Sequence, residues 1–202
     1  PLKSSHILWI NLITDSLPAL ALGVDVEEQK DYMNRPPRRR DESLFAGGGW
    51  GCTCFYGLLI AGISMLAFLQ GPVGTIKSAG MTLTIPHLQA VLKDAQVLAR
   101  SQTYAFTVLG MAQLFHAIGM RDVETSVFCM NHLENRLMLA AFAVGISLQM
   151  MVTEVPYFVQ LFGTCRLTAL EWTKLLGLAA MPLLAPVSYT HLRAHETDSY
   201  LV

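Results

Sequence analysis

Apolar residues in this chain gather into five long runs, separated by segments that carry most of the charge. A helix needs about 20 predominantly apolar residues to cross a bilayer. The fourth run is long and clean, whereas the fifth is shorter and contains Glu171 and Lys174. The pattern predicts an all-α membrane protein, a bundle of about five transmembrane helices at residues 7–26, 48–69, 102–120, 137–159 and 170–187.

The first run holds an acid at a depth where lipid makes a charge costly. Asp15 lies in its middle, Asn11 lies one helical turn earlier on the same face, and Thr14 is close beside them. Pro18 has no N–H to donate and so predicts a break in the helix. Three oxygen-bearing side chains beside a broken helix favour a site for a hard cation such as Ca²⁺. The alternative is that Asp15 only pairs with a polar group on a neighbouring helix.

Segment 27–43 holds five of the chain's basic residues and sets the expected topology. By the positive-inside rule it lies in the cytoplasm, because it contains Lys30, Arg35, Arg38, Arg39 and Arg40. Alternation then places the N-terminus and segment 71–101 outside. Interleaved acids nearly neutralise the basic run, which favours a solvated turn over a lipid-binding patch. In the outer segment, 81–85 reads as strand-like and 87–101 as an amphipathic surface helix.

The composition agrees with a membrane protein. Hydrophobic residues make up 52% of the chain, charged residues 14%, and the mean hydropathy is +0.42. Soluble domains have roughly 25% charged residues. The net charge of −1 gives no sign of a nucleic-acid partner. Cys52 and Cys54 face different directions on a helix, and the remaining two cysteines lie on opposite sides, so we expect no disulfide framework.

Two consecutive stretches carry a resemblance to a known family. The sequence WINLITDSLPALALGVD, followed by MNRPPRRRDESLF, resembles the sixth transmembrane helix and the next cytoplasmic loop of P-type calcium-transporting ATPases. The similarity runs from the N-terminus to about residue 185, which implies that the five spans correspond to helices six to ten of those pumps. The resemblance implies that Asn11, Thr14 and Asp15 ligate transported Ca²⁺. It also implies an integral, multi-pass protein of a membrane, with a bacterial plasma membrane as the expected location.

Gln113 marks a departure from the two-site members of that family. The aligned position in their eighth helix is a Glu, whereas this chain has an amide that keeps an oxygen but no charge. The resemblance therefore implies one full-strength Ca²⁺ site, with Gln113 as a tentative fourth ligand. Apart from the resemblance, Gln113 can equally be a polar residue that bonds across helices, with His116 as its partner.

The sequence lacks the family's catalytic motifs. The phosphorylated Asp-Lys-Thr-Gly-Thr, the Thr-Gly-Glu loop and a nucleotide domain are absent from these 202 residues. We therefore expect no catalytic residue in this chain and no ATP hydrolysis by it alone. In the family, ATP and Mg²⁺ bind in other domains of the same polypeptide. The lipid bilayer, the earlier helices and those cytoplasmic domains are the expected partners.

The last residues break the apolar pattern. Residues 187–202 resemble a translated sequencing adapter, so we expect a C-terminal cation-transporting ATPase membrane domain at 1–186 followed by a non-native tail. The other acid within a span, Glu154, lies near the far headgroups and is expected to be interfacial rather than an ion ligand. Two other classes stay open: a secondary cation transporter, which would show a second interrupted span, and a noncatalytic membrane scaffold.

Overall fold

Helices provide the regular structure of the described chain. The computed structural model describes residues 2–14, 16–24, 49–120 and 135–184, and within these ranges it contains no β-strand. The N-terminal segment has three pieces: α1 (Ser4–Trp9), the π-helix η1 (Ile10–Thr14) and α2 (Ser16–Gly23). After these come α3 (Gly49–Ser78), α4 (Ile85–Val91), α5 (Ala95–Gly119), α6 (Arg136–Glu154), α7 (Pro156–Phe162) and α8 (Ala169–Ala179).

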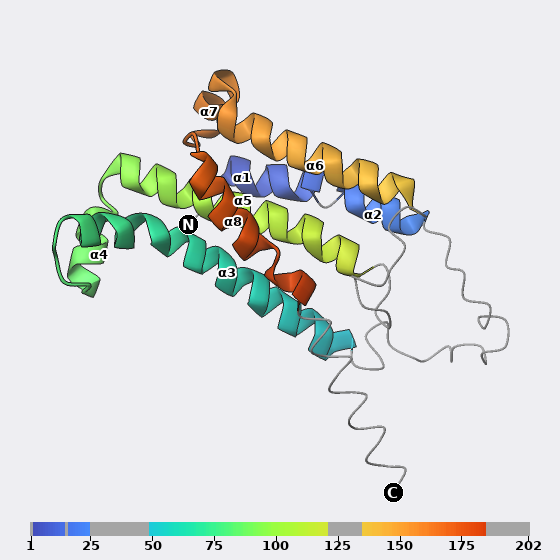
Figure 1. The fold of residues 1–202 in the computed structure, drawn as a ribbon, viewed down its shortest axis with the longest axis horizontal. Helices are drawn as coiled ribbons and strands as arrows, with labels where there is room; N and C mark the ends of the chain where they lie inside the picture. The colour runs from blue at the N-terminus through green and yellow to red at the C-terminus, as the bar shows by residue number, and fades with distance from the viewer. Residues whose placement is uncertain (1, 15, 25–48, 121–134, 185–202) are drawn as a thin grey trace, which may run out of the picture.

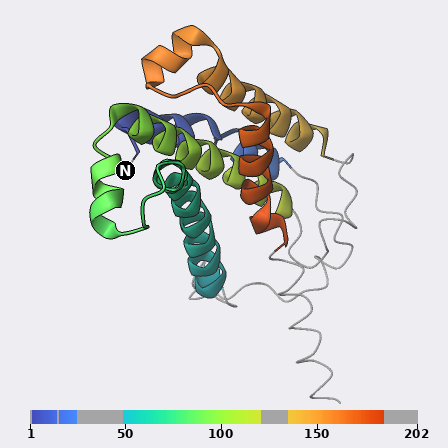
Figure 2. The ribbon, with the colours of Figure 1, turned by 60° about the vertical axis from the view of Figure 1, so that its left-hand side comes forward.

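The helix α5 lies at the centre of the bundle. It packs between α3 on one side and the N-terminal helices and α6 on the other, with α8 crossing it (Figures 1 and 2). Residues 101–108 of α5 are all buried. The largest cluster of buried apolar side chains joins α5 to α3 and α8 and includes Ile63, Ala67, Val108, Met111 and Leu175. Other helices therefore surround α5, and its Gln and Thr side chains can find partners inside the protein.

Among the described helices, α3 and α6 are each long and apolar enough to cross a membrane. The other predicted spans look different for separate reasons. The first is divided into three pieces, α5 contains more polar residues, which lie inside the bundle, and α8 has 11 residues. The all-helical class is confirmed, while the number of five spans stays a prediction.

The outer segment differs from the prediction in two places. Helix α3 continues to Ser78, past the predicted end at 69, and passes through the buried Pro72. The strand-like interpretation of 81–85 is wrong, since residues 81–84 form no strand and Ile85 begins α4. A strand needs a neighbouring strand to satisfy its backbone, and the described chain offers none. The amphipathic helix is divided at Asp94, whose side chain accepts a hydrogen bond from the Gln96 N–H at 2.8 Å and begins α5.

The connection between α6 and α8 is held by side chains that bond to its backbone. The Glu154 carboxylate accepts from Trp172 Nε1 at 2.8 Å and from the Leu167 N–H at 3.3 Å. Thr103 on α5 accepts from the Cys165 N–H at 2.9 Å. Glu154 thus fixes the turn of the chain between α6 and α8. The described cysteines, Cys52, Cys54 and Cys165, are free thiols.

Candidate cation site

The predicted break in the first span is confirmed. Helix α1 passes directly into η1, whose wider turns pair each N–H with the carbonyl five residues earlier, and α2 begins at Ser16. Pro18 is the third residue of α2, and the first N–H groups of a helix have no partner inside that helix. The proline therefore fits at the start of α2 without the loss of a bond. We call α1, η1 and α2 together the ion helix.

Of the three N-terminal candidates, the structure describes Asn11 fully and Thr14 in part. Asn11 lies in η1, and its side chain is exposed on a face that also exposes Leu8 and Leu12, which are 67% and 64% accessible. Thr14 is the last residue of η1, and its side chain lies outside the described residues, as does the whole of Asp15. At membrane depth an amide among exposed leucines needs another polar or protein group against it.

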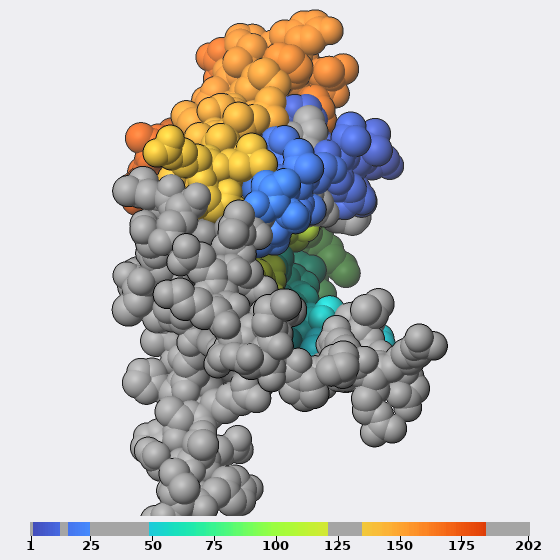
Figure 3. Space-filling model, turned by 90° about the vertical axis from the view of Figure 1, so that its right-hand side faces the viewer, coloured from blue at the N-terminus to red at the C-terminus, as the bar shows by residue number. Residues whose placement is uncertain are grey.

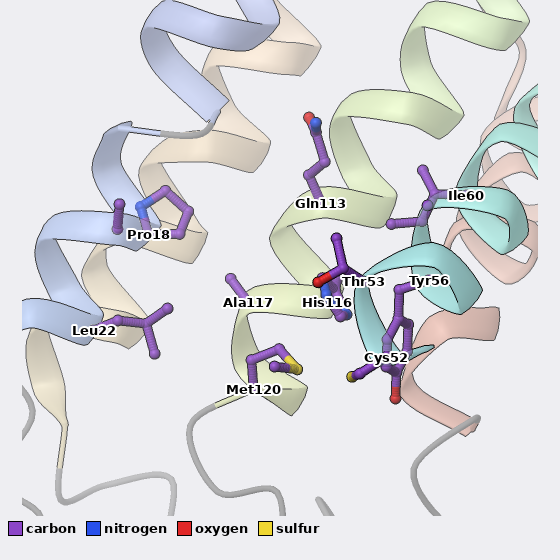
Figure 4. A pocket seen from close by; sticks show the side chains of 12 residues that line it. Pro18, Leu22, Cys52, Thr53, Tyr56, Ile60, Gln113, His116, Ala117 and Met120 are labelled. Carbon is purple, nitrogen blue, oxygen red and sulfur yellow. The ribbon is translucent and has the colours of Figure 1, made fainter. Parts of the chain in front are cut away.

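Gln113 lies on α5 and lines a cavity of about 430 Å³ between α2, α3 and α5 (Figure 4). From α2 the cavity is lined by Pro18, Ala19 and Leu22. The structure therefore brings Gln113 near the second half of the ion helix, while Asn11 is not among the described residues that line this cavity. The alternative partner of Gln113, His116, packs its ring against that of Tyr56, with 4.3 Å between the centroids.

One residue that sequence reasoning missed holds the C-terminal end of the ion helix. Asn135 precedes α6, is buried, and its Nδ2 donates to the Ala21 carbonyl at 3.0 Å. Its Oδ1 accepts from the Met138 N–H at 2.7 Å. Helix α2 packs along α6 in the same region (Figure 3). An Asn before an apolar run is a known signal for a helix start, but that signal does not name Ala21.

A second set of bonds holds the N-terminal end of the ion helix. The fully buried His6 donates from Nε2 to the Phe162 carbonyl at 3.0 Å, because a carbonyl can only accept. Lys3 Nζ donates to the next carbonyl, Gly163 O, at 3.1 Å. The His6 ring also stacks on Phe106 of α5, with 4.5 Å between the centroids. The ion helix is thus tied at both ends, on either side of the π-helical η1.

The described residues offer only part of a metal shell. Within them, no three His, Cys, Asp or Glu side chains gather at one point. Asn11 and Gln113 can provide neutral oxygens, which suit hard cations. A Ca²⁺ ion takes roughly 6 to 8 oxygen ligands. These side chains can therefore complete a shell only together with other oxygen donors.

Comparison with known proteins decides the family. The model of the family "Cation transporting ATPase, C-terminus" matches residues 1–188. The chain belongs to this family. A secondary transporter or a scaffold is consequently not favoured.

Relatives in this family are named as calcium transporters. The chain is 35% identical over 183 residues to Calcium-transporting ATPase 1 of Bacillus cereus, covering 91% of this chain and 20% of that protein. Identity to the Calcium-transporting ATPase of Bacillus subtilis is also 35%, over 90% of this chain and 18% of that protein. Human Calcium-transporting ATPase type 2C member 1 is 29% identical, over 89% of this chain and 17% of its own length. The chain thus spans about a fifth of these relatives.

Proposed function

We propose that this chain is the C-terminal membrane segment of an ATP-driven calcium pump and contributes part of its transmembrane Ca²⁺ site. The observation that carries the proposal is the interruption of the ion helix at η1, which contains Asn11 and Thr14 and which Asp15 follows in the sequence. The family and the names of the relatives support Ca²⁺ as the transported ion.

In this proposal Asp15 supplies the charge of the site and Asn11 and Thr14 supply neutral oxygens. An acid with no water around it binds a divalent cation more strongly than any amide or hydroxyl does. Gln113 is a tentative fourth ligand, because it lines the cavity beside α2 and keeps an amide oxygen. The exposed face around Asn11 then receives further ligands from the rest of the polypeptide.

The complete pump binds ATP and Mg²⁺ outside this chain. Phosphorylation there would move the membrane helices, distort the oxygen cage around Asp15 and release Ca²⁺ outside. The membrane domain comprises residues 1–186 in five spans, with 187–202 a non-native tail that lies outside the described residues. Its lipid environment is a bacterial plasma membrane, and segment 27–43, also outside the described residues, faces the cytoplasm.

The test is Asp15→Asn in the complete polypeptide. We expect Ca²⁺-dependent ATP hydrolysis to fall by about 100-fold or more, because a buried divalent cation loses its charged ligand. The measurement is the ATPase rate in reconstituted membranes as a function of free Ca²⁺.

The matched control is Glu154→Gln, which also replaces a membrane acid by its amide. Its side-chain oxygen still accepts from Trp172 and Leu167, so we expect the Ca²⁺ dependence of the unmodified protein. An unchanged Ca²⁺ dependence in Asp15→Asn would contradict the ion-site proposal.

A further inference from the structure

Asn135 satisfies the open ends of two helices at once. The last four carbonyls of a helix and its first N–H groups have no partner inside that helix. Helix α2 ends at Gly23, which leaves the Ala21 carbonyl open, and Asn135 Nδ2 fills it at 3.0 Å. Helix α6 begins at Arg136, which leaves the Met138 N–H open, and Asn135 Oδ1 fills it at 2.7 Å. A single side chain therefore joins the end of the ion helix to the start of α6.

The surroundings make this connection rigid. Ala21 is fully buried and packs in one cluster with Met138 and Ala141 of α6. Asn135 itself is 6% exposed, so water does not compete for its amide. A slide of α2 along α6 would leave a buried carbonyl and a buried amide without partners, which is expensive in a dry interior. The bond from Asn135 to Ala21 thus fixes the position of α2 along the axis of α6.

Ala21 lies six residues after Asp15 in the sequence and within α2, the helix that follows Asp15. Oxygen ligands must be held within a few tenths of an ångström of their productive positions for tight metal binding. We propose, as an extension of the calcium-pump function above, that Asn135 is a positioning residue for the Ca²⁺ site. It does not touch the ion and acts by holding the α2 end of the helix that carries Asn11, Thr14 and Asp15.

The two roles of Asn135 can be separated by substitution. Asp and Ser are strong residues at a helix start, because their side-chain oxygens accept from the first-turn N–H groups. Asn135→Asp therefore keeps the acceptor for Met138 but has no N–H₂ to donate to Ala21. Asn135→Ser also keeps an acceptor, on a side chain too short to bond both partners. Both variants retain the start of α6 and lose the tie to the ion helix.

The experiment measures Ca²⁺-dependent ATP hydrolysis of the complete polypeptide in reconstituted membranes. We expect both variants to raise the Ca²⁺ concentration for half-maximal rate by about three- to tenfold, the scale of one lost buried hydrogen bond. The rate at saturating Ca²⁺ should stay within about twofold, because the chemistry lies elsewhere in the pump. A general loss of fold would lower that rate instead.

Asp94→Ala is the matched control. It removes the side chain that starts α5, where Asp94 accepts from Gln96 N–H, and makes no bond to the ion helix. In Asp94→Ala the Ca²⁺ concentration for half-maximal rate should be unchanged. An equal rise in Asp94→Ala would overturn the positioning role, and so would an unchanged value in both Asn135 variants. If both Asn135 variants fail to insert while Asp94→Ala folds, Asn135 serves the fold and the proposal also fails.

Asp15→Asn, measured alongside, separates this inference from the function on which it rests. Loss of Ca²⁺ dependence in Asp15→Asn with no effect in the Asn135 variants rejects the positioning role alone. An unchanged Ca²⁺ dependence in Asp15→Asn rejects the calcium site itself, and the positioning role with it.

Discussion

At the scale of single residues, Gly163 shows how the N-terminal end of the ion helix is held. Its backbone is left-handed, with a φ of 62°, and ends α7. An added Cβ would collide with Lys3 Nζ, which donates to the Gly163 carbonyl. We expect Gly163→Ala to lower the free energy of unfolding by about 1–2 kcal/mol, because an alanine is strained in the left-handed conformation, whereas the exposed Lys3 side chain can move away. Thermal inactivation of the complete polypeptide in detergent measures this.

Gly74→Ala is the control for that experiment. Gly74 lies within α3, nothing lies within 4 Å of an added Cβ, and Ala is the better helix former. Its inactivation temperature should stay the same or rise. Equal behaviour of the two variants would contradict the account of Gly163.

Single residues also show what local sequence can and cannot reveal. An acid with an amide one turn away in an apolar run is a local pattern, so Asn11, Thr14 and Asp15 could be proposed directly. The bond from Asn135 to Ala21 joins residues 114 positions apart. Neither the sequence around Asn135 nor the sequence around Ala21 indicates this bond, because the two residues meet only when α2 packs against α6.

At the scale of helices, the contact of α5 with α6 depends on the missing side chain of Gly145. A Cβ there would lie 2.7 Å from Leu114 Cδ1 and 2.8 Å from Cδ2, and Leu114 is 1% exposed. We expect Gly145→Ala to cost about 1–3 kcal/mol of stability, because a buried leucine has little room to move. Adding Leu114→Ala removes the overlap, so the double variant should be more stable than the sum of the single changes by about 1 kcal/mol.

A cycle of thermal-inactivation measurements on the four proteins tests this contact. Strict additivity of the two changes would show that α5 and α6 do not approach each other as described. A double variant less stable than the sum of the two single changes would also contradict the contact, because truncating Leu114 would then not relieve the overlap with the Cβ added at Gly145.

Helix boundaries illustrate why part of the fold escaped prediction. Pro18 correctly indicated an interruption of the first span, yet the π-helix η1 before it has no sequence signature of its own. Pro72 lies inside α3, which nevertheless continues to Ser78. Packing of Ile76 and other buried side chains against the bundle stabilises that extension, and such tertiary contacts override local preferences.

At the scale of the whole molecule, the proposed ion site needs oxygen ligands beyond those that this chain provides. The ion helix exposes Leu8 and Leu12 near Asn11 and Leu20 on α2, and the chain spans about a fifth of the relatives named above. We expect the isolated chain in detergent to show no saturable Ca²⁺ binding at submicromolar concentrations, because it supplies too few of the roughly 6 to 8 oxygens required. Equilibrium dialysis with radioactive Ca²⁺ measures this.

The complete polypeptide under the same conditions is the positive control. Submicromolar binding by the isolated chain would show that its own residues close the shell, and the assignment of further ligands to the rest of the pump would be wrong. Hydropathy alone was enough to predict the all-helical class. It did not predict that α5 lies at the centre of the bundle, because hydropathy does not tell which helices pack around which.

The two ties of the ion helix also bear on how the protein is made. The ion helix is the first element of this chain, but its partners are Asn135, Phe162 and Gly163, which the ribosome adds much later. Synthesis proceeds from the N-terminus at about 5–20 residues per second, so the ion helix waits several seconds in the membrane before either end can be fastened. A nascent chain that stalls before residue 135 therefore lacks both sets of hydrogen bonds, and α5, with Phe106 against His6, is the part of the bundle already made that can hold the ion helix.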